Sequence, residues 1–168
     1  MGKKVLKIIL IVTFLILGIG ICVFCFWNSR QKHETDLYSV AISKEWSVEE
    51  PYEDCKSFVV DDNRVAGIEV FRDCSYCESA ESIGTNIFGE HGYAKTMEET
   101  VVNGWTRYKM IVDYELTAAE EMQGTTKETS QLHYIYTNKK DIFIDVYINE
   151  QLLSENEIQK FINSFEVK

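Results

Sequence analysis

Alternating apolar and polar side chains recur along the chain after residue 37, and they predict a series of strands. Asn103-Gly104 lies between two of these segments, and both residue types tolerate the positive φ of a type I′ hairpin turn. Short connections of this kind favour antiparallel pairing. The expected strands cover residues 38–43, 58–60, 65–71, 97–102, 107–116, 132–136 and 142–148.

Two segments change to a spacing of three and four residues, which is typical of amphipathic helices. The first follows Glu78 and ends at Gly89 and Gly92. The second begins at Ser154, which forms a capping box with Glu157. The apolar stripes are Ala80, Ile83, Ile87 and Phe88 in the first helix, and Ile158, Phe161, Ile162 and Phe165 in the second.

The order of these elements predicts an α+β domain: a mainly antiparallel sheet with two packed helices. Residues 117–128 are compatible with a short helix or a loop, and we expect a loop. Five aromatic residues are expected to fill the core and sheet faces rather than to form a ligand platform: Trp46, Trp105, Tyr108, Tyr134 and Tyr136.

Residues 8–27 form a run of twenty residues without a charge, long enough as a helix to cross a bilayer. A cleaved signal peptide fits poorly, because seven apolar residues follow the small residues Gly18 and Gly20. Neither Cys22 nor Cys25 follows a small residue, as a lipoprotein site requires, and Leu6 does not fit an N-myristoylation motif. We therefore expect a retained transmembrane helix.

The charges that flank this span predict its orientation. Lys3, Lys4 and Lys7 precede it, whereas only Arg30 and Lys32 follow closely, so the positive-inside rule places the N-terminus in the cytoplasm. The predicted organisation is a cytoplasmic segment at 1–7, the span at 8–27, a polar stalk at 28–36 and an extracytoplasmic domain at 37–168. The expected location is the cell membrane, with a single pass.

The part of the chain beyond the span is acidic. All 27 Asp and Glu residues lie there with 14 of the 17 Lys and Arg residues, a formal charge of −13. Such a surface repels nucleic acid, so no nucleic-acid partner is expected. The expected partners are the bilayer, through residues 8–27, and a protein or small molecule that the composition does not identify.

Three cysteines in the predicted outer domain are candidates for chemistry. Cys74 and Cys77 are separated by two residues, between a strand and a helix start, as in thiol-disulfide oxidoreductases. However, no proline follows Cys77 to face such a disulfide, and the downstream strands are consecutive. The alternatives are a zinc site formed by Cys55, Cys74 and Cys77 with His91 or His133, and a structural disulfide between two of the three cysteines.

The first strand, YSVAISKEW (38–46), and the closing residues INSFEVK (162–168) resemble the PsbP-like fold. The matching residues are Tyr38, Trp46, Ser164 and Phe165; the chain departs from the family's pattern at 43–45, where a proline is common. The resemblance implies a binding or accessory domain. With no catalytic residue, metal ligand or cofactor assigned, we expect a membrane-anchored, non-catalytic binding domain, the alternative being an oxidoreductase that uses Cys74 and Cys77.

Overall fold

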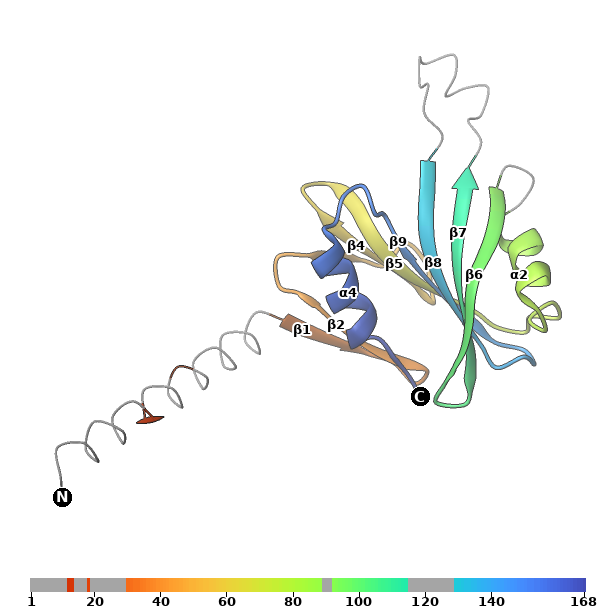
Figure 1. Cartoon of the computed structure of the whole chain (residues 1–168), viewed down its shortest axis with the longest axis horizontal. Helices are drawn as coiled ribbons and strands as arrows, with labels where there is room; N and C mark the ends of the chain where they lie inside the picture. The colour runs from red at the N-terminus through yellow and green to blue at the C-terminus, as the bar shows by residue number, and fades with distance from the viewer. Residues whose placement is uncertain (1–11, 14–17, 19–29, 89–91, 115–128) are drawn as a thin grey trace, which may run out of the picture.

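A computed structural model of the chain describes residues 12–13, 18, 30–88, 92–114 and 129–168, and their strands form two antiparallel sheets (Figure 1). The small sheet has the order β1 (Arg30–Glu34), β2 (Tyr38–Ser43) and β10 (Glu166–Val167). The large sheet has the order β3 (Ser47–Glu49), β4 (Cys55–Val60), β5 (Asn63–Phe71), β9 (Phe143–Ile148), β8 (Thr129–Thr137), β7 (Trp105–Tyr114) and β6 (Gly92–Val102).

Two helices pack on these sheets, so the predicted α+β class with mainly antiparallel pairing is confirmed. The helices are α2 (Ala80–Ile87) and α4 (Glu155–Ser164). The expected single sheet is two sheets, because β2 pairs with β1 and with the short β10 rather than with the following strands. Neither β3 nor β10 was predicted from the pattern.

The main core lies between one face of the large sheet and a layer made of α4 and the small sheet (Figure 1). The predicted stripe of α4 is buried there, with Phe161 2% and Phe165 6% exposed. Phe161 lies 5.5 Å from Phe58 of β4, measured between ring centroids. Burying each such ring stabilises the fold by about 1.5–3 kcal/mol, which holds α4 on the sheet.

The opposite face of the large sheet is only partly covered. α2 and the turn before it pack on β7, β8 and β9 through Ile83, Phe88 and Cys77, and they form a second, smaller core. In Figure 1, α2 lies at the β6 edge of this sheet, on the side away from α4. The face formed by β4, β5 and the end of β9 therefore has no helix above it in the described part of the chain.

Several local predictions agree with the structure. Asn103 and Gly104 have φ values of 51° and 82°, as a type I′ turn requires. In β7 the predicted alternation holds, with Tyr108, Met110 and Val112 buried. The capping box is also present, since Glu157 accepts from the backbone N–H of Ser154 (2.8 Å) while Ser154 accepts from that of Glu157.

The predicted stalk is wrong over residues 30–34, because they form β1 and pair with β2 from Arg30 opposite Ser43 to Glu34 opposite Ser39. Backbone hydrogen bonds hold this strand, and its polar side chains gave no alternating signal. The predicted loop at 117–128 lies outside the described residues. Apart from Val12, Thr13 and Gly18, so does the predicted span at 8–27. Within the described residues, no helix is both long and apolar enough to cross a membrane.

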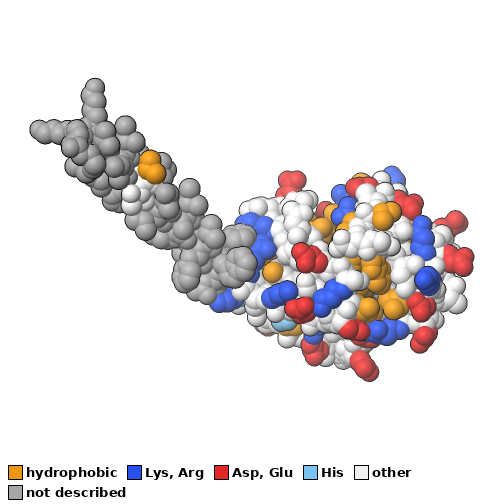
Figure 2. Space-filling model, turned by 90° about the horizontal axis from the view of Figure 1, so that it is seen from below, with side chains coloured by type: hydrophobic (Ala, Val, Ile, Leu, Met, Phe, Trp, Pro, Cys, Tyr) orange, Lys and Arg blue, Asp and Glu red, His pale blue; other side chains and the backbone are white. Residues whose placement is uncertain are grey.

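Charges of both signs are interspersed over the surface that Figure 2 displays. Several form exposed ion pairs, such as Lys32 with Glu34 (3.0 Å) and Arg72 with Asp54 (2.9 Å). Exposed pairs of this kind contribute at most about 1 kcal/mol each. The surface charge therefore bears on solubility and on the choice of partner more than on the fold.

The capping box generates the first prediction. Ser154→Ala removes the N-cap and should lower the free energy of unfolding by about 1 kcal/mol at pH 7. The hydrogen bonds from Ser154, first its side chain and then its backbone, lower the pKa of Glu157. A lowered carboxyl pKa stabilises the fold above its ordinary value near 4.5, and this contribution is lost as the pH falls through the lowered value.

The difference between Ser154→Ala and the wild type should therefore shrink at acid pH, as measured by urea unfolding at pH 7 and pH 3. Asn156→Ala, an exposed change in the same turn, is the control and should change the free energy by less than about 0.5 kcal/mol. An undiminished difference at pH 3 would show that the Glu157 carboxylate does not contribute to the cap.

Candidate functional site

The uncovered face of the large sheet contains a pocket of about 350 Å³, which we call the tyrosine pocket after Tyr52, Tyr114 and Tyr147 in its wall. The strand register brings its residues together. Cys55 of β4 is opposite Glu69 of β5, which is opposite Asp145 of β9. Paired residues point to the same side of a sheet, so side chains from these three strands meet on one face. Ile87 and Phe88, at the end of α2, form the opposite wall.

A buried histidine–aspartate pair lies in this pocket. His133 and Asp145 are 2% and 4% exposed, and Nδ1 of His133 lies 2.9 and 3.1 Å from the two carboxylate oxygens. Because a carboxylate accepts hydrogen bonds, Nδ1 donates and Nε2 faces away from Asp145. Nε2 is buried and has no hydrogen-bond partner among the described residues. A buried polar atom without a hydrogen bond lowers the stability of the fold by about 1–3 kcal/mol, so Nε2 destabilises the protein unless a ligand or water binds it.

Phe88 holds this histidine from the helix side. The two rings meet edge to face, with centroids 4.7 Å apart. Phe88 is the residue after α2, where its backbone N–H donates to the carbonyl of Gly84 (3.2 Å) and ends the helix. The position of α2 on the sheet therefore determines how deeply His133 is covered.

The floor of the pocket is the ring of Tyr147, which lies across β5 at Gly67. A Cβ atom at Gly67 would lie 2.2 Å from Cζ of Tyr147, so only glycine lets the ring adopt this position. The Tyr147 hydroxyl lies 3.3 Å from Oγ of Ser57 on β4. Burial raises the pKa of Tyr147, and the hydroxyl stays protonated at neutral pH. Tyr147 thus spans three strands and presents a neutral aromatic surface.

Two opposite charges stand at the edge of this floor. Glu69 accepts a hydrogen bond of 2.5 Å from the hydroxyl of Tyr52, which raises the pKa of Tyr52. Arg64 reaches the pocket because β5 contains a bulge. The register with β4 shifts between Phe58 and Val59, so Val65 and Ala66 both point into the main core and Arg64 points to the other face. Bulges often redirect a side chain in this way.

The three predicted cysteine candidates do not come together. Cys74 and Cys77 form a disulfide with each other, and Cys55 is a free, buried thiol in the tyrosine pocket. A bridge from Cys55 to either partner is therefore not formed, and two disulfide-bonded sulfurs cannot serve as zinc ligands. The described residues contain no group of three potential ligands that could hold a metal ion. His91 lies outside them.

The disulfide turn is fastened to the sheet by hydrogen bonds on both sides. The backbone N–H of Cys74 donates to the carbonyl of Asp141 (2.9 Å), and Oγ1 of Thr137 donates to the carbonyl of Cys77 (2.9 Å). Cys74 is 5% exposed and Cys77 is fully buried. The turn therefore anchors the start of α2 over the second core.

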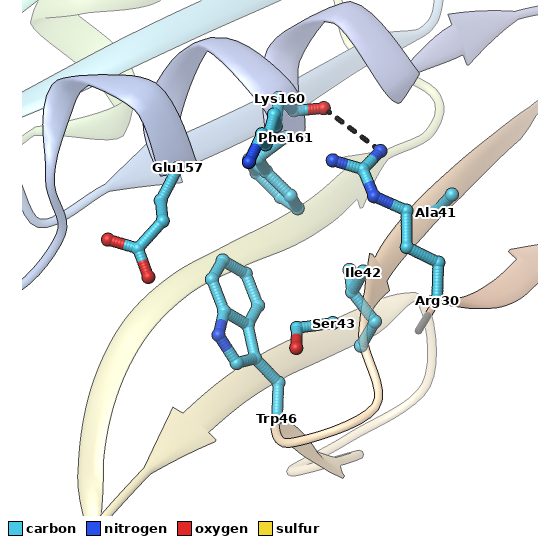
Figure 3. Close-up of a pocket in the computed structure, with 8 residues that line it drawn as sticks. All are labelled: Arg30, Ala41, Ile42, Ser43, Trp46, Glu157, Lys160 and Phe161. Carbon is cyan, nitrogen blue, oxygen red and sulfur yellow. Dashed lines mark hydrogen bonds between the residues drawn. The ribbon is translucent and has the colours of Figure 1, made fainter. Parts of the chain in front are cut away.

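A second hollow of about 200 Å³ lies between α4 and β2 (Figure 3). Trp46 and Phe161 approach each other in it, with ring centroids 5.7 Å apart, and a guanidinium N–H of Arg30 donates to the carbonyl of Lys160 at 3.5 Å. Glu157 on its rim already belongs to the capping box. Its polar groups thus serve the fold, whereas the tyrosine pocket contains an unpaired buried nitrogen. We therefore take the tyrosine pocket as the candidate site.

No protein-family model matches this chain, and no curated protein is similar to it at a significant level. Among solved structures, the chain is similar to a crystal structure of a protein from Bacteroides thetaiotaomicron VPI-5482, with a TM-score of 0.46 and 14% sequence identity. The alignment covers 83% of this chain and 49% of that protein, so the chain spans about half of its length.

The close approach of Tyr147 to Gly67 generates the second prediction. Gly67→Ala forces the Tyr147 ring off β5 and breaks its contact with Ser57, so it should lower the free energy of unfolding by about 1–3 kcal/mol in urea titrations. In a Tyr147→Ala background the clash is absent, so Gly67→Ala should leave the free energy of unfolding almost unchanged. Equal costs in the two backgrounds would contradict the assigned contact.

Proposed function

We propose that the chain is a single-pass, membrane-anchored protein whose extracytoplasmic α+β domain binds a small ligand in the tyrosine pocket without transforming it. The observation that carries this proposal is the pocket itself: about 350 Å³ of space, aromatic walls and a buried imidazole nitrogen with no partner. Sites for small molecules are concave, largely apolar and at least about 300 Å³ in volume, with a few polar groups that fix orientation.

The strand order favours binding over nucleophilic catalysis. Cys55 and His133 both line the pocket, but β5 and β9 separate their strands, and three strand spacings amount to about 14 Å. A base must lie about 3 Å from the proton that it removes. Burial also raises the pKa of the Cys55 thiol, which disfavours the reactive thiolate.

The finer fold assignment, PsbP-like, is part of the same proposal. Its support is that the four residues of the resemblance belong to one contact region between the opening strand and the closing helix. Tyr38 stacks on Phe165 with centroids 5.5 Å apart, and the hydroxyl of Ser164 donates to the carbonyl of Ala41 (2.9 Å). Trp46 packs on Phe161 in the same core.

The anchor is the second part of the proposal, and the apolar run at 8–27 is its basis. Since β1 begins at Arg30, only two residues separate the end of this run from the folded domain. A retained span would therefore hold the domain close to the outer surface of the membrane rather than on a flexible stalk.

The third prediction tests the anchor. The full chain should stay in the membrane fraction after carbonate washing, whereas Leu15→Arg with Leu17→Arg should release it, because each arginine at the centre of a span costs about 2.5–3.5 kcal/mol. Leu15→Ala with Leu17→Ala is the matched control and should remain bound. A wild-type chain that washes off would refute the membrane assignment.

The fourth prediction tests the pocket with the full chain in lipid nanodiscs. Compounds selected by thermal shift from a fragment collection should bind at least tenfold more weakly to Tyr147→Ala, which removes the pocket floor. Lys160→Ala, on the rim of the hollow beside α4, should leave their affinity unchanged. The opposite pattern, or hits that are insensitive to both changes, would place the binding site elsewhere.

The observed disulfide keeps thiol-disulfide exchange as the alternative function. An attacking thiolate needs access to a sulfur, and Cys74 and Cys77 are both buried. The fifth prediction is therefore a reduction potential below about −300 mV for this bond, measured by equilibration with a dithiol buffer. A potential near −200 mV would instead favour the oxidoreductase.

A further inference from the structure

Arg64 and Glu69, a cation and an anion in the tyrosine pocket, form no ion pair within the described residues, whereas the third charged group there, Asp145, is hydrogen-bonded to His133. Arg64 is exposed and Glu69 is half-buried, and neither forms an ion pair with any described residue, including each other. Two other cations in this part of the sheet do form ion pairs: Lys56 with Glu50, and Arg72 with Asp54. The pocket is thus a place where two opposite charges are held apart.

The positions of these charges fix the scale of a ligand that could connect them. Arg64 and Glu69 lie five residues apart on β5, so their Cα atoms are at most about 16 Å apart at about 3.3 Å per residue. Both line the pocket, as does Cys55 of the neighbouring strand. Burial is the main cause of the raised pKa of that thiol; Glu69 raises the pKa further and Arg64 lowers it, so both charges lie near Cys55.

Neither charged side chain by itself forms a good binding site for a simple ion. An anion drawn to Arg64 would meet Glu69 and Asp145 in the same wall, and a cation drawn to Glu69 would meet Arg64. A molecule with both charges satisfies the two groups at once. Arginine binds a carboxylate through two parallel hydrogen bonds, and a glutamate flanked by an aromatic ring suits an ammonium group.

We propose that the tyrosine pocket binds a small zwitterion with an aromatic side chain, of the size of an amino acid or a dipeptide. Arg64 binds its carboxylate, and Glu69 with Tyr52 binds its ammonium group. The aromatic side chain packs on Tyr147, whose neutral ring forms the floor. This inference rests on the proposed function, since it names the ligand class for the same pocket.

The test uses the full chain in nanodiscs and alanyl-phenylalanine as the probe, with affinity measured by isothermal titration calorimetry. The free dipeptide should bind, and both its N-acetyl form and its C-terminal amide should bind roughly 10- to 100-fold more weakly, because each lacks one charge-assisted hydrogen bond. Phenylalanine is tested in parallel, as the shorter zwitterion of the same class.

Matched variants assign each charge to its partner. Arg64→Gln should weaken the free dipeptide and leave the amide unchanged, whereas Glu69→Gln should weaken the free dipeptide and leave the N-acetyl form unchanged. Lys160→Gln, a cation on the rim of the other hollow, should have no effect. Both pocket residues are at least partly exposed, and unfolding curves are expected to confirm that the variants fold.

The outcomes separate this inference from the proposed function. Equal affinity for free and capped dipeptides would overturn the zwitterion assignment. Binding of neither zwitterion, while fragments still occupy the pocket in a manner sensitive to Tyr147→Ala, would refute the ligand class and leave the pocket as a binding site. If no dipeptide, amino acid or fragment bound, both the ligand class and the proposed binding function would be refuted.

Discussion

The burial of the large sheet from both sides is the constraint on which the structure depends. β8 and β9 lie at its centre, with Ile144 and Val146 turned toward α4 and Phe143 and Ile135 turned toward α2. Strands with two apolar faces must be covered on both faces. Each aromatic or branched side chain that stays exposed loses about 1.5–3 kcal/mol of stabilisation from burial. The first face receives a full layer. The second receives one short helix and a disulfide turn.

This unequal cover explains where the pocket lies. α2 has eight residues, which is too short to extend over β4 and β5, so within the described residues no helix covers the sheet face beyond Phe88. Polar residues lie at the edge of the pocket, within central strands that are otherwise apolar. His133 and Asp145 form a hydrogen bond with each other, but Nε2 of His133 has no partner among the described residues. A stable core needs no such buried polar pair, because apolar residues of similar volume are often as stabilising. Its presence at the edge of an open pocket therefore supports a binding role.

The sequence predicted those features that short segments determine. Asn103-Gly104, the capping box at Ser154 and the alternation of β7 each depend on neighbouring residues, and all are confirmed. β1 was missed because its polar residues are held by the backbone of β2. The bulge in β5 involves Val65, and Gly67 makes room for Tyr147, a residue eighty positions away, so neither feature is visible in a short segment.

The candidate site depended on long-range register and was not predicted. His133 and Asp145 meet because β8 and β9 pair, and a polar residue within each apolar strand was the only signal in the sequence. Arg64 reaches the pocket only because of the bulge. Of the predicted candidates, Cys55 and His133 do lie in the pocket, whereas Cys74 and Cys77 bond to each other beneath α2. The aromatic residues Trp46, Tyr108, Tyr134 and Tyr136 fill the cores, as expected.

The most direct test of the central claim is to locate ligand binding on the protein by NMR, using full-length chain with ¹³C-labelled tyrosine and tryptophan rings. On titration with fragments, we predict saturable shifts at Tyr52, Tyr114 and Tyr147, with the signals of Trp46 and Tyr38 unchanged. Shifts confined to Trp46, or no saturable shift at any of the three pocket tyrosines, would contradict the account.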